Sequence, residues 1–244
     1  MKKRAKTALA VAVIVAVALG IPTWWYLYSS RKAMADFTPV DTGRIADGIV
    51  AIRDDFVNVW AFDANGSWIL FDAGTDAARL VDALEGMGIR ASEVKAVFLT
   101  HSDYDHVAAV SRFPNAVRYL SGEEVPLASG KAHRAFVFNN RFDGQYQTLR
   151  DGEVTRIGSR EIEALVTPGH TPGSTCYLVD GAYLVTGDAL GIRDGRIGVF
   201  SDFFNMDSGE AARSIERLFA RPELKVPVTI LSAHYGILRD YRAR

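Results

Sequence analysis

The stretch FLTHSDYDHV, residues 98–107, places two histidines and two aspartates directly behind an apolar run. The run Ala96–Leu99 is typical of a buried strand, so the polar residues that follow it should lie at the end of that strand. The four polar residues that could bind a metal are His101, Asp103, Asp105 and His106. Imidazole nitrogens and carboxylate oxygens are common ligands of Zn²⁺, Fe²⁺ and Mn²⁺. The stretch therefore predicts part of a site for divalent cations.

Three further candidate ligands also stand behind predicted strands. They are His170, Asp188 and His234, after the strands predicted at 161–166, 182–186 and 228–232. Taken singly, an Asp or His at such a position is often a turn or hydrogen-bonded residue. Four strand ends with the same residue types instead indicate one shared site. Only His133 of the five histidines lies outside this set, and we expect it on the surface or beside a ligand.

This set resembles that of the metallo-β-lactamase superfamily, whose members share a loop of type H-x-H-x-D-H, a later His, a bridging Asp and a final His. The resemblance covers about residues 45–238, and TPGHTPGS, residues 167–174, is close to the form seen in glyoxalase II-like members. Asp72, in LFDAG, matches the Asp-x-Gly strand end of the family. The resemblance implies an α+β fold, a four-layer αββα sandwich, with the metal site at one edge between two β-sheets.

Position in the family motif also implies a role for each residue. The first metal site would hold His101, Asp103 and His170, the second Asp105, His106 and His234, and Asp188 would bridge them. Asp105 would also orient the attacking water and is the predicted catalytic residue. Asp72 would support a ligand histidine or the backbone of the loop.

The loop departs from the family pattern at Asp103, where the family usually has its second histidine. A carboxylate is a harder donor than imidazole and adds negative charge to the first site. We therefore expect two divalent cations, zinc in the first place, with iron or manganese as alternatives. An H-x-D-x-D-H loop also resembles that of the metallo-β-lactamase-like domain of bacterial competence channels, and an acidic residue at this place resembles the flavodiiron oxidoreductases.

The composition suits one globular domain with an appendage: 244 residues, of which 48% are hydrophobic and 23% charged. The first 32 residues hold six of the 28 basic residues and none of the 29 acidic ones, so the remainder carries 22 positive and 29 negative charges, a net charge of −7. A body of this charge is disfavoured as a nucleic-acid binder. Cys176 is the only cysteine, which excludes an internal disulfide, and we expect it buried in an apolar strand.

The N-terminal segment is basic and then apolar. Residues 7–28 carry no charge and end in Trp24, Trp25, Tyr26 and Tyr28, as in a membrane-spanning helix with an aromatic belt. More basic residues precede this run than follow it, which predicts a single-pass inner-membrane protein with its catalytic domain on the outer (periplasmic or extracellular) face. A cleaved signal peptide, with an A-x-A site at 33–35, is the alternative.

These patterns predict four parts of the chain. They are a cytoplasmic basic N-terminus at 1–6, a transmembrane signal-anchor helix at 7–28, a linker at 29–43, and a metallo-β-lactamase-like domain at 44–244. Within the domain, Asn65-Gly66 predicts a hairpin turn, and helices are predicted at 76–86 and from 207 or 208 to about 219. Residues 121–150 show no clear period and could be a lid, a substrate loop or irregular surface.

The predicted function is a membrane-anchored hydrolase of a small-molecule substrate, with an ester, thioester, lactone, lactam or phosphodiester as the scissile group. Two bound cations would lower the pKa of a water, and the resulting hydroxide would attack the carbonyl or phosphoryl centre. The alternatives are a phosphodiesterase or nuclease, an iron-dependent oxidoreductase, and a binding domain without catalysis. The last is disfavoured because every expected ligand position carries Asp or His. The oligomeric state is left open.

Overall fold

The computed structural model describes residues 20–134, 140–142 and 144–242. Two compact units are distinguished, Met1–Asp36 and Phe37–Arg244. In the first unit, residues 20–33 are helical. The second unit contains the sheets and the candidate site, and it includes residues from Phe37 onward that belong to the predicted linker.

The predicted membrane location is contradicted. Among the described residues, no helix combines the length and apolar character needed to cross a bilayer. Residues 20–33 extend about 21 Å at the α-helical rise, against about 30 Å of hydrocarbon. The N-terminus predicted at 1–6 and most of the segment predicted to span the membrane, residues 7–19, lie outside the described residues.

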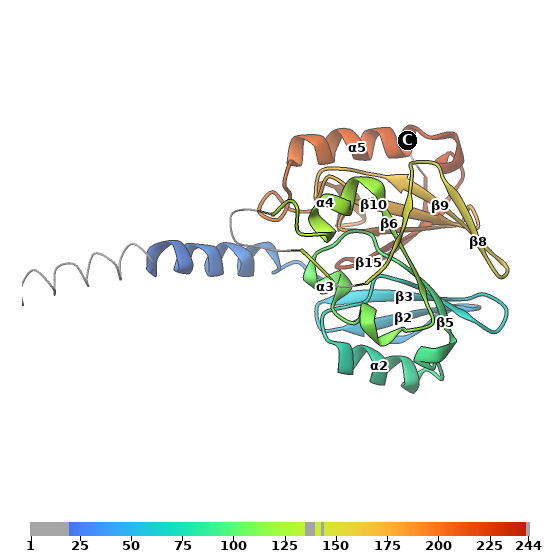
Figure 1. Ribbon diagram of the computed structural model, residues 1–244. Helices are drawn as coiled ribbons and strands as arrows, with labels where there is room; N and C mark the ends of the chain where they lie inside the picture. Colours follow the sequence, from blue (N-terminus) through green and yellow to red (C-terminus); the bar gives the residue numbers. More distant parts are fainter. Residues whose placement is uncertain (1–19, 135–139, 143, 243–244) are drawn as a thin grey trace, which may run out of the picture. The chain divides into compact units, whose positions relative to one another are not determined.

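Two sheets form the centre of the Phe37–Arg244 unit (Figure 1). The first runs in chain order through β1 (Gly43–Ala46), β2 (Ile49–Asp54), β3 (Val57–Asp63), β4 (Trp68–Phe71), β5 (Val94–Phe98), β6 (Val117–Ser121) and β7 (Gln147–Leu149). The second has the order β15 (Gly236–Tyr241), β14 (Val228–Ser232), β11 (Tyr183–Gly187), β10 (Thr175–Val179), β9 (Arg160–Val166) and β8 (Val154–Ile157). A separate hairpin pairs β12 (Gly191–Arg193) with β13 (Arg196–Gly198).

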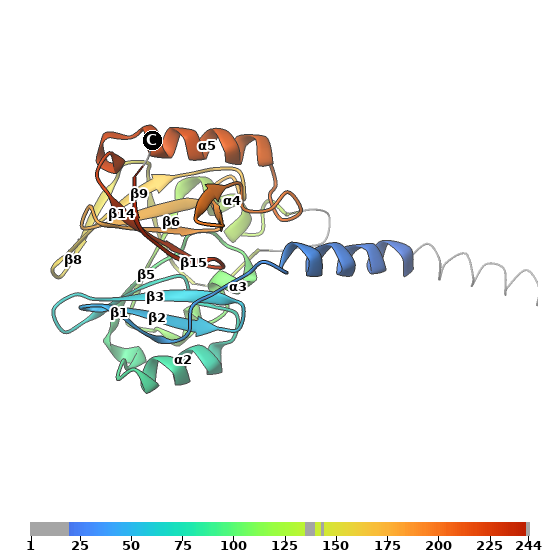
Figure 2. The same cartoon turned by 180° about the vertical axis from the view of Figure 1, so that it is seen from behind.

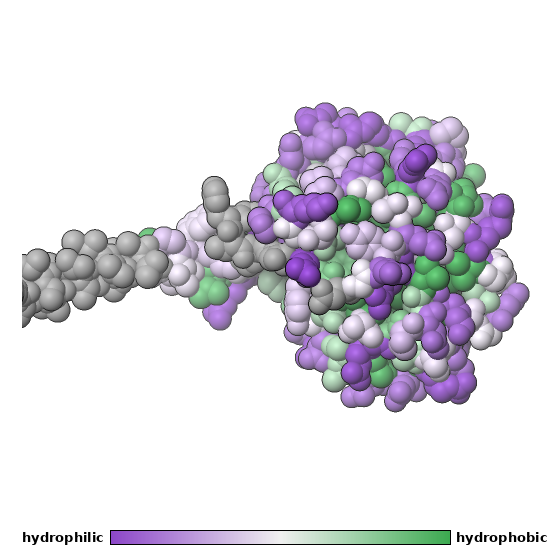
Figure 3. All heavy atoms as spheres, viewed as in Figure 1, coloured by the Kyte–Doolittle hydropathy of each residue, from purple (hydrophilic) through white to green (hydrophobic). Residues whose placement is uncertain are grey.

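Helices cover the outer face of each sheet. Figure 2, from behind, shows α2 (Ala77–Gly86) below the first sheet and α5 (Ser208–Ala220) above the second. Short helices complete the unit: α3 (Tyr104–Val107), α4 (Val125–Ala128), η1 (Ala91–Glu93), η2 (Val110–Arg112), η3 (Gly122–Glu124) and η4 (Pro222–Leu224). The outward face of α5 is mostly hydrophilic in Figure 3, as expected of an amphipathic helix on a sheet.

Three apolar clusters separate the four layers. Alternate residues of β2 point to opposite faces: Val50 and Ile52 pack toward α2, whereas Ile49 and Ala51 pack between the sheets. The third cluster joins the second sheet to α5, through residues such as Leu218. Both sheets are therefore buried on two faces, which explains their nearly continuous apolar strands. The predicted α+β sandwich is confirmed.

Several local predictions are also confirmed. Asn65 and Gly66 both have positive φ, 60° and 87°, as a tight hairpin between β3 and β4 requires. Asp76 and Asp207 cap α2 and α5 with their side chains. A further strand, β15, follows the strand predicted at 228–232. Sequence patterns did not predict β15, because its charged residues and half-exposed positions hide the strand pattern.

Cys176 provides a chemical test of this packing. It is fully buried in β10, and burial raises the pKa of its thiol to about 12. Since the thiolate is the reactive form, we expect no reaction of the native protein with a disulfide reagent at mildly alkaline pH. One thiol should react after denaturation. Rapid modification without loss of structure would contradict the packing of β10 between its neighbours.

Candidate metal centre

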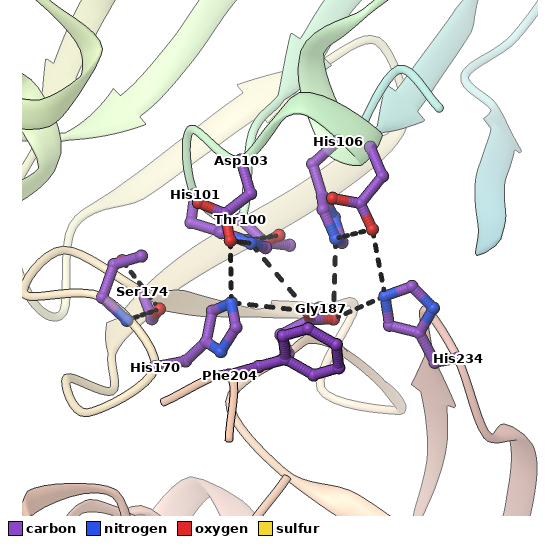
Figure 4. Close-up of polar contacts among 12 residues, drawn as sticks. Thr100, His101, Asp103, His106, His170, Ser174, Gly187, Phe204 and His234 are labelled. Carbon is purple, nitrogen blue, oxygen red and sulfur yellow. Dashed lines mark hydrogen bonds and ion pairs between the residues drawn. The ribbon is translucent and has the colours of Figure 1, made fainter. Parts of the chain in front are cut away.

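Strands from both sheets deliver the seven predicted ligands to one edge of the sandwich. The loop after β5 supplies His101 and Asp103, and its continuation in α3 supplies Asp105 and His106. His170 follows β9, Asp188 follows β11, and His234 follows β14. In Figure 4, His170 and His234 lie on opposite sides of the Gly187 position, and the side chains of the 101–106 segment face them.

Two of the four imidazoles are oriented through Asp72. His106 Nδ1 donates to Asp72 Oδ2 at 2.8 Å. Thr100 Oγ1 donates to the same carboxylate and lies 3.0 Å from His101 Nδ1. The backbone N–H of Thr100 also donates to Asp72 Oδ1 at 2.8 Å. Asp72 thus contacts both a candidate ligand and the start of the ligand loop, and these contacts turn the Nε2 atoms of His101 and His106 toward the site.

The other two imidazoles, His170 and His234, are held by contacts with separate segments of the chain. His170 Nδ1 lies 3.2 Å from Asn205 Oδ1. His234 Nδ1 donates to the carbonyl oxygen of Phe56 at 2.8 Å, and the ring of Phe37 stacks on His234 at 4.4 Å between centroids. Each of these histidines therefore contacts the protein through Nδ1 and directs Nε2 toward the site.

Asp188 lies between two groups of Nε2 atoms. Its Oδ2 is 3.4 Å from His170 Nε2 and 4.0 Å from His101 Nε2. Its Oδ1 is 3.2 Å from His234 Nε2 and 3.6 Å from His106 Nε2. One carboxylate thus presents one oxygen to each pair of histidines, which is the geometry that the bridging role requires.

The remaining two carboxylates divide between these groups. Asp103 Oδ2 lies 3.2 Å from His170 Nε2 and 3.5 Å from His101 Nε2. Asp105 Oδ2 lies 3.4 Å from His234 Nε2 and 3.5 Å from His106 Nε2. All seven side chains are therefore brought together in the two sets that the family pattern implies, and their role as ligands stays a prediction.

The donor atoms at the centre of the site fit a divalent cation. His101 Nε2, His106 Nε2 and Asp188 Oδ1 are buried and have no hydrogen-bond partner among the described residues. Leaving such atoms unpaired is costly unless a ligand satisfies them. Three groups have all their donor atoms within 4.8 Å of one another: His101 with Asp103 and His170, His101 with His106 and Asp188, and Asp105 with His106 and His234.

The pKa values of the four histidines are shifted in different directions by their surroundings. Burial, with the charge of His106, lowers the pKa of His101 to about 4. Burial also lowers the pKa of His170 well below its usual range. Burial alone would lower the pKa of His234, but the carboxylates of Asp188 and Asp105 together outweigh it and raise this pKa to about 9. The carboxylates therefore stabilise positive charge most strongly on His106 and His234, whose pKa values are both raised.

Sequence reasoning missed two residues that contact the predicted first group. Arg134 forms an ion pair with Asp103 Oδ2, and Asn140 donates to Asp103 Oδ1. Both residues belong to the region 121–150, whose polar residues show no periodic pattern. His133, next to Arg134 in the chain, is exposed.

A third missed residue holds the ligand loops together. Glu124 is fully buried and accepts hydrogen bonds from the backbone N–H and hydroxyl of Ser102, from the hydroxyl of Thr171, and from the backbone N–H of Gly173. Ser102 lies between two candidate ligands, and Thr171 follows His170. Because Glu124 is one of two adjacent glutamates in a short polar stretch, nothing local in the sequence distinguishes it from an exposed residue.

Comparison with known proteins agrees with this arrangement. The family model of the metallo-beta-lactamase superfamily matches residues 52–234. A probable zinc-dependent hydrolase of polyketide biosynthesis from Bacillus subtilis, PksB, is 31% identical over 142 residues, which are 57% of this chain and 53% of the relative. The chain thus spans about half the length of this curated relative.

Solved structures share the fold at low identity. A metallo-β-lactamase with a HARLDQ motif from Cronobacter sakazakii has a TM-score of 0.63 at 22% identity, over 83% of this chain and 81% of that one. A B3 metallo-β-lactamase with an active-site glutamic acid has a TM-score of 0.64 at 20% identity, over 88% of this chain and 87% of that one. The B3 enzyme BJP-1 of Bradyrhizobium japonicum has a TM-score of 0.60 at 18% identity, over 83% of this chain and 81% of that one.

The family model covers most of the chain, from β2 to the last candidate ligand, His234. The chain therefore belongs to the metallo-β-lactamase superfamily, and the predicted family is confirmed.

Proposed function

We propose that this protein hydrolyses a small-molecule substrate at a carbonyl centre, in an ester, thioester, lactone or lactam, with the help of a divalent cation, zinc first. The observation that carries the proposal is the position of Asp188, whose two oxygens face two different pairs of histidine nitrogens. A divalent cation bound there lowers the pKa of a water and polarises the scissile bond. The relative from Bacillus subtilis supports zinc-dependent hydrolysis, since it is named as a probable zinc-dependent hydrolase of polyketide biosynthesis.

Asp105 is the proposed catalytic residue. Burial would raise the pKa of its carboxyl group, but the charges of the neighbouring His106 and His234 hold that pKa well below the usual range. Asp105 is therefore ionised at neutral pH. An ionised carboxylate can accept a hydrogen bond from the attacking water and orient it. The hydrogen bond from His106 Nδ1 to Asp72 keeps His106 Nε2 directed toward the site.

Aromatic side chains around the histidines give the site an apolar wall. Phe37 stacks on His234, and the edge of Phe200 meets the ring of His170 at 5.1 Å between centroids. Tyr104, between two candidate ligands in the chain, is 72% exposed. Apolar surroundings of this kind favour a substrate with an apolar portion next to its reacting group. The net charge of −7 beyond residue 32 speaks against a polynucleotide substrate.

The proposal is tested with the full-length protein, first chelated and then titrated with Zn²⁺, Mn²⁺ or Fe²⁺. Chromogenic ester, thioester, lactone, lactam and phosphodiester substrates are offered in each state. We expect hydrolysis of a carbonyl substrate that disappears with the measured metal content and returns with one cation. Undiminished hydrolysis by metal-free protein would contradict metal dependence, and cleavage of the phosphodiester alone would assign the phosphodiesterase alternative. Oxygen consumption by the iron form without hydrolysis would assign an oxidoreductase.

A further inference from the structure

A guanidinium group occupies the predicted first metal site. Arg134 pairs with Asp103 Oδ2 through Nη1, and the same nitrogen lies 3.2 Å from His170 Nε2. Nη2 donates to the carbonyl oxygen of Phe204, so the group is held from both sides. The Arg134 side chain is only 14% exposed. Two of the three donors of the predicted first site thus already face a fixed positive charge.

Asp103 is engaged on both of its oxygens. Oδ2 pairs with Arg134, and Oδ1 accepts from Asn140 Nδ2. A carboxylate pairs well with a guanidinium, whereas an imidazole in its place would supply no negative charge. This pairing gives the departure from H-x-H-x-D-H a reason other than a preference for a harder metal. Asp103 is the ion-pair partner of Arg134.

Among the described residues, the predicted second metal site, formed by Asp105, His106, His234 and the bridging Asp188, contains no comparable positive group. In the described ranges, the structure gives neither Asp105 nor Asp188 an ion pair with a lysine or arginine. Asp188 Oδ1 and His106 Nε2 are the buried, unpartnered atoms of this group. His101 Nε2 is also unpartnered, and it lies within 4.8 Å of the donor atoms of His106 and Asp188. The three donor atoms without a hydrogen-bond partner therefore lie at or next to the predicted second metal site.

Charge balance favours a single divalent cation. The three carboxylates that face the histidine Nε2 atoms, Asp103, Asp105 and Asp188, carry three negative charges. One divalent cation and the Arg134 guanidinium together carry three positive charges. A second divalent cation would lie against the guanidinium in a largely buried site, where repulsion between like charges is poorly screened.

Resting on the proposed metal-dependent function, we propose that Arg134 takes the place of the first cation. The chain then binds one divalent cation, in the group formed by Asp105, His106, Asp188 and His234, and Asp103 serves to hold Arg134. The guanidinium is a permanent positive charge beside the bound cation. Its removal opens the first group to a second cation.

The test is metal stoichiometry, measured by elemental analysis after equilibrium dialysis of the full chain against buffered free Zn²⁺. We expect about one equivalent in the unchanged protein and about two in Arg134→Gln, as a two-metal site needs every donor free. Lys131→Gln is the matched control, because it removes a positive charge from an exposed position of the same segment and should keep one equivalent. Asp105→Asn should lose the single equivalent.

Some outcomes would overturn the inference. Two equivalents in the unchanged protein would refute it and leave the proposed hydrolase intact, whereas no bound cation at all would refute both. One equivalent in both the unchanged protein and Arg134→Gln would show that Arg134 does not exclude a cation. Zinc-edge X-ray absorption of the unchanged protein tests the inference without any variant: we expect no metal–metal scattering at about 3.5–4 Å, and its presence would refute the proposal.

Discussion

Asp188→Asn lowers cation affinity and hydrolytic activity more than about 100-fold, beyond the loss that follows removal of a group that only supports a ligand. The reason is the place of this carboxylate, with Oδ1 3.2 Å from His234 Nε2 and Oδ2 3.4 Å from His170 Nε2. An amide keeps one oxygen but turns an NH₂ group toward the other nitrogen. It also removes one of the negative charges that hold the cation. Competition with a chromophoric chelator measures affinity, and the substrate found for the parent protein measures activity.

The expected loss is local, so the thermal midpoint of metal-free Asp188→Asn should stay close to that of the metal-free parent. Asp194→Asn is the matched control. Asp194 is an exposed turn residue with φ of 51°, a conformation that asparagine also adopts readily. This control should retain affinity and activity. If Asp188→Asn bound the cation as tightly as Asp194→Asn, Asp188 would not be a ligand and the centre would lie elsewhere.

The sequence predicted the parts of the site that stand at strand ends. Each candidate ligand follows an apolar run, and strand ends of a layered sheet meet at one edge, so residue type and position sufficed to group His101 with residues more than a hundred positions away, such as His234. Local turn and capping chemistry likewise sufficed for the hairpin at Asn65-Gly66 and for the start of α2 at Asp76.

What could not be predicted depends on contacts between distant segments that lack a local pattern. Arg134 and Asn140 reach Asp103 from an irregular stretch, in which neither periodicity nor a motif indicates direction. The sequence interpretation of Asp103 considered its hardness as a donor and its negative charge, but not Arg134, because no sequence pattern pairs the two residues. Tertiary pairing, not the loop itself, decides what this carboxylate faces.

Glu124→Ala destabilises the protein by about 4 kcal/mol, because it leaves several buried donors without an acceptor. Those donors belong to both ligand loops: Ser102 donates through its backbone N–H at 3.0 Å and its hydroxyl at 2.6 Å, and Thr171 donates at 2.7 Å. Gly173 N–H donates to the same carboxylate at 3.0 Å. Equilibrium denaturation in urea, on metal-free protein, measures the free energy of unfolding.

The same substitution should weaken cation binding about 10- to 100-fold although Glu124 touches no candidate ligand, because it frees Ser102 and with it the loop that carries Asp105 and His106. Glu123→Ala is the matched control: this neighbour is exposed and should change neither quantity by more than about 0.5 kcal/mol. Glu124→Gln keeps the shape but places an NH₂ group against at least one donor, so its stability should fall between the other two. A loss of stability in Glu124→Ala with unchanged cation affinity would show that the ligand loops keep their positions without this carboxylate, and that the site depends on the strand ends alone.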